Sequence, residues 1–284
     1  MKKMRNILHI ILIIILLIIF FYSGYQIVSY VKESVDNKKL VNDLTELAVE
    51  FNEQPLTVED FYENLDKVSS DKKEENTIDS EKEYVVPLLS PLKVNFDLLK
   101  KTNEDVKAWL YCENTMINYP VAQGSDNSEY LYTLLNGEYN RGGTLFMEST
   151  NKDDFSDWNT LIYGHNMANG SMFGELRQFK TTAYRNYHPV FLITTDTGVY
   201  TYRIFSAFEA SVTDPVFMIQ VGRNDEKQSL IDCAVEKSVI ATGTIPSIED
   251  HVVTLSTCTG RGYATRWVVV GRLESFLESA DVNG

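Results

Sequence analysis

An apolar segment close to the N-terminus constrains this chain more than any other feature. Residues 7–28 are predominantly apolar, and the cations that precede them, Lys2, Lys3 and Arg5, have no acidic residue among them. A helix of about 20 apolar residues, rising about 1.5 Å per residue, spans the ~30 Å hydrocarbon core of a bilayer. Because the cations precede the segment, it predicts a single-pass anchor in the cell membrane, with residues 1–6 cytoplasmic and the remainder outside the cell.

A cleaved signal peptide is the alternative to a retained anchor. Such a peptide has a shorter apolar stretch that ends at a cleavage site of small residues. Here the run continues into Tyr22, Tyr25 and Gln26 instead. We therefore expect the segment to be retained.

The rest of the chain has the composition of a globular domain. The whole chain of 284 residues carries 26 Lys and Arg against 40 Asp and Glu, a formal net charge of −14. A negative surface repels phosphate groups, so nucleic acid is not expected as a partner. Cys112, Cys233 and Cys258 are too few for a disulfide-stapled scaffold, and their odd number leaves at least one thiol unpaired. A disulfide between Cys112 and Cys233 stays open as an alternative.

Composition also divides the extracellular part into segments. Apolar residues recur at helical spacing from Val31 to Phe51, and a Thr-x-x-Asp cap at Thr57 follows Pro55, which predicts a helical stalk with a second short helix. Residues 67–83 are mostly polar and charged, as in a linker. We expect the stalk and linker to span 29–86, one catalytic or binding domain 87–276 and a tail 277–284.

Short β-branched and aromatic runs separated by turn residues dominate the chain after Pro87. They predict eight strands, at 106–110, 117–121, 143–147, 160–163, 190–194, 199–207, 251–256 and 266–273. Apolar residues at helical spacing predict one helix, at 225–240, before the last two strands. A mainly β domain, a barrel or a sandwich, with added helices is the expected fold.

Cys258 has the surroundings of a nucleophile. It ends a strongly apolar strand and is followed by the turn sequence Thr-Gly-Arg-Gly. A thiol at a strand tip is held rigidly on one side and is open on the other. Cys112 and Cys233 lie within an amphipathic run and within the predicted helix, where a small apolar side chain is the usual role.

A nucleophilic cysteine needs a histidine that raises its thiolate fraction and moves protons. Of the four histidines, His9 lies in the anchor, His188 precedes a proline, and His251 lies roughly 20 Å from Cys258 along the same strand, at ~3.3 Å per residue. His165 directly follows the strand at 160–163 and is the candidate. A structural hydrogen-bonding role for His165 is the alternative.

An oxyanion formed by attack on an acyl group needs a fixed donor, and arginine suits this role. Arg266 opens the last strand, so a hairpin after Cys258 returns it beside the thiol. Arg261 lies at the loop tip and is expected to be solvated. Arg272 lies some 20 Å down the strand by the ~3.3 Å rise and is expected to pair at the far end of the barrel.

The residues around these three positions resemble the sortases, the cysteine transpeptidases of Gram-positive surfaces. Residues 254–258, Thr-Leu-Ser-Thr-Cys, are similar to the T-L-x-T-C signature, and Arg266 follows eight positions later. Residues 159–174 resemble the histidine segment of class B sortases, and Trp109 with residues 117–124 resembles their early strands. The resemblance spans about residues 94–273. Two features depart from it: a glycine-rich loop at 259–262 that would loosen the hairpin, and Trp267 in place of a smaller aromatic.

The resemblance implies a fold and a mechanism. The fold is an eight-stranded β-barrel of the sortase type, with N-terminal helices and a helix between strands six and seven. Cys258 would attack the carbonyl of a Thr in a C-terminal sorting motif of a secreted protein, with an N-P-x-T-[NG]-like sequence, and form a thioester. His165 would transfer protons, and Arg266 would hold the oxyanion or the substrate backbone.

The resemblance also implies the partners of the enzyme. An amine of a peptidoglycan precursor would resolve the thioester, at the cell membrane. No metal or other cofactor is implied, and the sequence has no clustered carboxylate loop of the kind that calcium requires. Residues 212–243 would read the sorting motif, and Ser256, Thr257 and Asn166 are candidate substrate-binding residues.

Two other functions compete with a transpeptidase. A cell-wall cysteine hydrolase or peptidase would use the same thiol and histidine but deliver water. A papain-like fold is disfavoured, because its cysteine opens a helix whereas Cys258 ends a strand. A non-enzymatic, membrane-tethered binding module would not need Cys258, His165 and Arg266, and all three are present.

Overall fold

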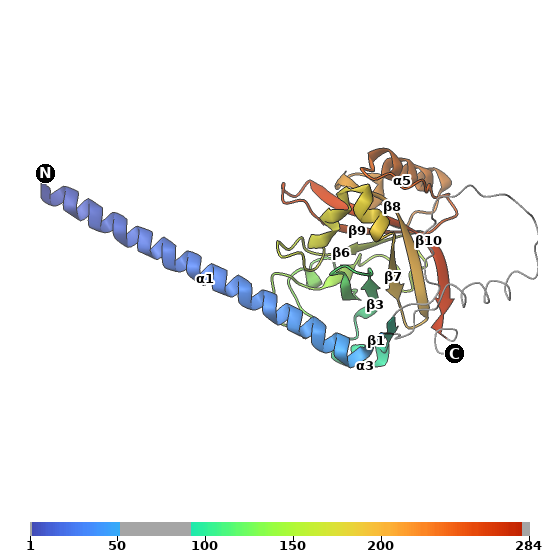
Figure 1. Cartoon of the computed structure of the whole chain (residues 1–284), viewed down its shortest axis with the longest axis horizontal. Helices are drawn as coiled ribbons and strands as arrows, with labels where there is room; N and C mark the ends of the chain where they lie inside the picture. The colour runs from blue at the N-terminus through green and yellow to red at the C-terminus, as the bar shows by residue number, and fades with distance from the viewer. Residues whose placement is uncertain (1, 52–91, 280–284) are drawn as a thin grey trace, which may run out of the picture.

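A computed structural model of the chain describes residues 2–51 and 92–279 (Figure 1). One long helix, α1 (Lys2–Ala48), leads into a β-rich domain. Its N-terminal half extends away from the domain, and its C-terminal half lies along one side of it (Figure 1). The apolar side chains from Ile7 to Phe21 are exposed. Among the described residues, α1 is the one helix long and apolar enough to cross a membrane.

The core of the domain is a closed barrel of eight strands, which confirms the predicted fold. The strands neighbour one another in the order β10-β8-β7-β3-β4-β5-β6-β9. They are β3 (Val106–Tyr111), β4 (Asn118–Ala122), β5 (Leu145–Met147), β6 (Asn159–Tyr163), β7 (Val190–Thr194), β8 (Gly198–Ser211), β9 (Val252–Cys258) and β10 (Thr265–Glu278). Each corresponds to a predicted strand, although β8 and β10 extend several residues further because they pair with each other along their length.

β9 and residues 268–271 of β10 are buried on both faces, which explains their continuous apolar sequence. Leu255 and Val269 point into the barrel, whereas Val268 and Val270 belong to a second core on the outside. Helix α5 (Asn224–Lys237) covers this outer face with its buried side chains Leu230, Ile231 and Ala234. It lies between the sixth and seventh barrel strands, as predicted, and ends before Ile240, which packs in the barrel core.

The C-terminal half of α1 packs on the barrel. Leu44 and Ala48 share a buried core with Leu99 of α3 (Phe96–Thr102) and Trp109 of β3. After Ala48 the chain forms β1 (Val49–Phe51), which pairs antiparallel with β2 (Leu92–Val94). The predicted continuation of the helix through Phe51 is therefore wrong, because pairing with a distant strand overrides a helical pattern. The predicted cap at Thr57 and the linker lie outside the described residues.

Several short elements were not predicted from the sequence. Besides α3, these are the α-helix α4 (Thr182–Tyr187) and the 3₁₀ helices η1 (Glu129–Leu131), η2 (Gly174–Lys180) and η3 (Pro215–Phe217). Three to seven residues carry too few repeats of an apolar pattern to be recognised. One of them, η1, supports the functional site.

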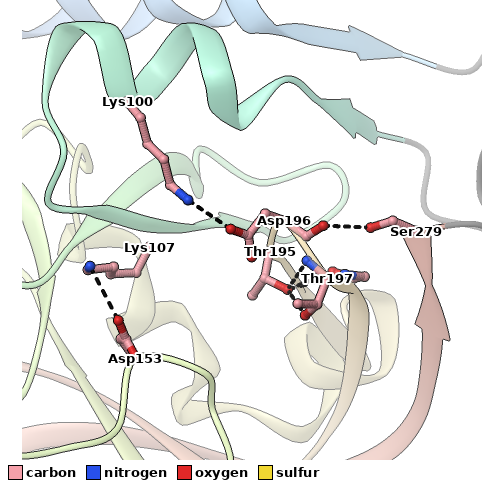
Figure 2. A network of polar contacts seen from close by, with 8 residues as sticks. Lys100, Lys107, Asp153, Thr195, Asp196, Thr197 and Ser279 are labelled. Atoms are coloured by element: carbon pink, nitrogen blue, oxygen red, sulfur yellow. Dashed lines mark hydrogen bonds and ion pairs between the residues drawn. The ribbon is translucent and has the colours of Figure 1, made fainter.

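Polar contacts tie one end of the barrel together (Figure 2). Lys100 of α3 forms an ion pair of 2.7 Å with Asp196 in the β7–β8 turn, and the hydroxyl of Ser279 donates to the Asp196 carbonyl at 2.9 Å. In the ladder between β8 and β10, this end is marked by the pair Gly198 and Glu278, and the opposite end by the pair Ser211 and Thr265. The hairpin that carries Cys258 is at that opposite end.

Candidate functional site

Cys258 and Arg266 lie side by side at the open end of the barrel. They are direct partners in the antiparallel β9–β10 ladder, and Arg272 pairs with Val252 at its other end. Directly opposed residues of a ladder project from the same face of the sheet. The side chain of Cys258 is exposed, and that of Arg266 is half-buried. The register therefore places a reachable thiol next to a guanidinium, as the hairpin argument predicts.

The loop that joins Cys258 to Arg266 is tied by side chains in spite of its glycines. Gly260 and Gly262 adopt positive φ angles of 78° and 105°, which favour glycine. The hydroxyls of Thr259 and Thr265 hydrogen-bond to each other at 2.8 Å across the base of the loop. Arg261 at its tip forms a 2.7 Å ion pair with Glu209. The loop is therefore closed beside the thiol rather than loosened.

Trp267, the other departure from the expected pattern, has a structural contact of its own. Its indole nitrogen donates to the carbonyl of Leu176 in η2 at 2.8 Å. The ring packs against the barrel core. It thus fastens the first residues of β10 to the segment that follows the histidine loop.

Backbone pairing brings His165 level with Cys258. Strand β6 runs parallel to β9, with Tyr163 opposite Ser256. The pairing continues beyond β6, because the amide of Gly164 donates to the Ser256 carbonyl at 3.2 Å. The amide side chain of Asn166 then donates to the carbonyl of Cys258 at 2.6 Å. His165 lies between these two contacts, so the loop after β6, the end of β9 and the start of β10 bring His165, Cys258 and Arg266 into one row.

The imidazole of His165 is oriented by a segment that the sequence did not point to. Its Nε2 lies 2.7 Å from the carbonyl oxygen of Leu131, at the end of η1. A carbonyl only accepts hydrogen bonds, so Nε2 carries the proton, and Nδ1 is the nitrogen that is free to accept one. The ring of Tyr132 lies against the imidazole, with the ring centroids 5.3 Å apart.

A buried carboxylate holds the η1 segment in place. Glu148 is 5 % exposed, and both its oxygens accept hydrogen bonds of 2.7 Å from the side chain of Asn127. The hydroxyl of Tyr163 donates to it at 2.9 Å. Burial and this carboxylate raise the pKa of Tyr163, which keeps the phenol protonated as a donor. The contacts link the segment before η1 to the last residue of β6.

The guanidinium of Arg266 uses one of its nitrogens to bind the backbone, and the others remain able to donate hydrogen bonds. Its Nη1 donates to the carbonyls of Tyr263 and Thr265, both at 2.9 Å. Within residues 2–51 and 92–279, no carboxylate forms an ion pair with it. An arginine whose charge is not neutralised and whose fork is held by backbone is suited to stabilise a developing negative charge.

The three predicted substrate-binding residues lie close to the row of His165, Cys258 and Arg266, but their side chains face different groups. The hydroxyl of Thr257 donates to the carbonyl of Gly164 at 2.7 Å, on the face of β9 opposite to Cys258. Ser256 shares the face of Cys258, and its buried hydroxyl has no hydrogen-bond partner among the described residues. The side chain of Asn166 holds the Cys258 backbone.

The two remaining cysteines differ from Cys258. All three thiols are free, so no disulfide joins Cys112 to Cys233. Burial raises the pKa of Cys112 to about 12, and burial also raises that of Cys233. Both thiols therefore stay protonated at neutral pH. Arg272 contacts Asp250 at 3.9 Å, away from the site, as expected.

Comparisons with known proteins agree with this geometry. The sortase domain family matches residues 110–274. A sortase B of Listeria monocytogenes is 33% identical over 177 residues, which cover 62% of this chain and 72% of that protein. A sortase B of Staphylococcus aureus is 28% identical over 201 residues, 71% of this chain and 80% of that protein.

Solved structures show the same likeness. A crystal structure of Staphylococcus aureus sortase B superposes with a TM-score of 0.60 at 29% identity, over 63% of this chain and 86% of that one. The structure of sortase B from B. anthracis gives 0.65 at 25% identity, over 85% and 98%. The eight-stranded barrel and these matches define a sortase fold. The chain belongs to the sortase family, in class B, and is a cysteine transpeptidase of the sortase type.

Selective alkylation tests the exposure of the three thiols. In the folded chain, iodoacetamide should modify Cys258 first, because its side chain is exposed whereas Cys112 is buried with a raised pKa. Peptide mass spectrometry after timed labelling measures the order, and a Cys258→Ala variant identifies the background. Modification of Cys112 before Cys258 would contradict the geometry. Unfolding the chain should make all three react.

Removal of the Glu148 carboxylate should destabilise the domain. Glu148→Ala leaves Asn127 and Tyr163 without their buried acceptor, which costs about 1–3 kcal/mol in free energy of unfolding. Glu138→Ala, at an exposed position in the loop between η1 and β5, should change it by less than about 0.5 kcal/mol. Urea titration followed by circular dichroism measures both variants. Equal stabilities would show that Glu148 does not support the loop.

Proposed function

We propose that this sortase is a membrane-anchored enzyme that attaches secreted proteins to the cell wall through a thioester on Cys258. The observation that carries the proposal is the row formed by Cys258 at the end of β9, Arg266 at the start of β10 and His165 in the loop that follows the adjacent strand β6. A thiol, a proton carrier and a guanidinium that no described carboxylate neutralises are the groups that acyl transfer requires.

The first half of the reaction forms the acyl-enzyme. Nδ1 of His165 takes the thiol proton, and the sulfur of Cys258 attacks the carbonyl carbon of the Thr in the sorting motif. The resulting oxyanion accepts hydrogen bonds from Arg266. As the C–N bond breaks, the imidazolium gives its proton to the departing amine, which leaves a thioester between Cys258 and the Thr carbonyl.

The second half transfers the acyl group to an amine. The incoming amine attacks the thioester carbonyl and gives a proton to Nδ1 of His165. The tetrahedral intermediate then expels the sulfur, which recovers a proton from the imidazolium. A peptidoglycan precursor is the proposed donor of this amine. Among the relatives, a sortase B has been solved in complex with triglycine, and Staphylococcus aureus sortase B has been solved as a substrate complex.

Recognition of the sorting motif is assigned to the segment around α5. Residues 212–243 lie beside the outer face of β9 and β10, the face from which Cys258 and Arg266 project. Ser256 continues this face below the thiol, but its hydroxyl is buried, so it supports the strand beneath the thiol instead of contacting the substrate directly. A motif of the N-P-x-T-[NG] type is the proposed sequence, and secreted proteins that end in such a motif are the proposed partners.

Helix α1 is the proposed anchor. Its residues 7–28 are long enough to span a bilayer, and the apolar side chains among them are exposed. The cations Lys2, Lys3 and Arg5 before the apolar segment support a cytoplasmic N-terminus and a barrel outside the cell. Enzyme, secreted substrate and a lipid-linked amine then meet in one layer, which raises their effective concentration.

Amine dependence distinguishes transfer from hydrolysis. The full chain in detergent is incubated with peptides that carry candidate sorting motifs, with and without triglycine, and products are identified by mass spectrometry. Transpeptidation predicts a ligated product that appears only with the amine, and Cys258→Ala should abolish both the product and the thioester adduct. Cleavage that the amine does not change would identify a hydrolase, and an adduct that persists in Cys258→Ala would refute the site.

Arg266 should not be replaceable by lysine. Arg266→Lys removes the planar fork, and loss of an oxyanion donor lowers turnover by roughly 10²–10³-fold. Arg261→Lys is the matched control, because Arg261 is exposed at the tip of the same loop and pairs with Glu209. Initial rates of amine ligation measure both. A near-normal rate in Arg266→Lys would remove Arg266 from the reacting centre.

A further inference from the structure

The loop that precedes β5 is fastened to α1 close to the end of its apolar segment. Nη2 of Arg141 donates to Gln26 at 3.1 Å, and the backbone amide of Arg141 donates to the Glu33 carboxylate at 3.1 Å. The side chain of Asn140 donates to the Glu33 carbonyl at 2.7 Å. One turn further along, the side chain of Asn37 donates to the Gly143 carbonyl at 3.0 Å. Because α1 is continuous, these contacts set the height of the loop relative to the apolar segment.

The position of these contacts on α1 corresponds to the headgroup region of a bilayer. The apolar segment ends at Val28, and Glu33 lies about 8 Å further along the axis at ~1.5 Å per residue. The polar region on each side of the hydrocarbon core is about 5–8 Å thick. Gln26 lies within the segment itself. Residues 139–143 are therefore held at headgroup depth when residues 7–28 span the membrane.

The side chains around this contact are those that prefer such a depth. Tyr139 is 67% exposed and Tyr132 is 45% exposed, and their rings stack with the centroids 6.1 Å apart. Tyr22 and Tyr25 lie at the same end of the apolar segment and are 62% and 69% exposed. Tyrosine is enriched at membrane interfaces because its ring is apolar and its hydroxyl is polar.

We propose that Tyr132 and Tyr139 form a surface that contacts the phospholipid headgroups of the membrane in which α1 is anchored. The inference rests on the anchor of the proposed function. It adds that the barrel lies against the bilayer instead of standing clear of it. The continuity of α1 argues for lipid as the partner, since the same helix that enters the membrane carries the loop. A second copy of the chain is the competing occupant.

The contact has a consequence for the reaction. The ring of Tyr132 contacts both Tyr139 and His165, so the imidazole lies one ring contact from the proposed lipid surface. An amine carried on a lipid would then reach the site without leaving the membrane.

The depth of Tyr139 is measurable with a tryptophan. The full chain is reconstituted in phosphatidylglycerol–phosphatidylcholine vesicles that contain lipids brominated near the carbonyl end of the acyl chains. Tyr139→Trp places an indole in the proposed surface. Phe51→Trp is the matched control: Phe51 is 50% exposed and follows the end of α1, which lies about 30 Å beyond Val28 by helical rise. The unsubstituted chain supplies the background of the native tryptophans.

If the surface contacts lipid, the bromolipids should quench the fluorescence of the indole at position 139 at least roughly twice as strongly as that of the indole at position 51. Equal quenching, or none at position 139, would overturn the inference. A second copy of the chain would give a different result: the indole at position 139 would be shielded from acrylamide, the shielding would grow with protein density, and bromine would not quench it. That result would also overturn the inference. Flotation of the vesicles separates the two proposals: a chain that does not float with lipid contradicts the anchor itself, whereas a chain that floats unquenched contradicts only the surface.

Discussion

The pairing of β9 with two neighbours is the constraint on which the site depends. β10 pairs with it antiparallel and sets Arg266 opposite Cys258, and β6 pairs with it parallel and carries the chain on to His165. A slip of one residue in either ladder would turn a side chain to the other face of the sheet. Burial of β9 on both faces makes such a slip costly, so the core of the barrel and the alignment of the site have the same origin.

A second set of contacts orients the aligned side chains for the proposed reaction. The carbonyl of Leu131 keeps the proton on Nε2 of His165, and that carbonyl is positioned by a segment that Glu148 ties to β6. The catalytic roles proposed for the histidine therefore depend on a buried carboxylate that touches neither substrate nor thiol. The loop between Cys258 and Arg266 is restrained in the same way by its own threonines.

Helix α1, the proposed anchor, is part of the same folded unit as the barrel. Its C-terminal half contributes to a core with α3 and β3, and its middle binds the loop before β5 at Arg141. Tyr132, earlier in the same loop, packs against His165. An anchor joined through an extended linker would leave the height of the site above the membrane free. A continuous helix packed on the barrel restricts that height, which links the position of the proposed anchor to the access of a lipid-linked amine.

Local patterns in the sequence were sufficient for the apolar segment, the eight barrel strands, α5, and the proximity of Cys258 to Arg266, because each depends on residues close together in the chain. The end of α1 and the orientation of His165 could not be predicted in this way, because they depend on contacts between residues far apart in the sequence. The end of α1 at Ala48 follows from a strand at residues 92–94, and the orientation of His165 follows from Leu131. Neither contact has a local signature, since each forms only when the barrel closes and brings the two segments together.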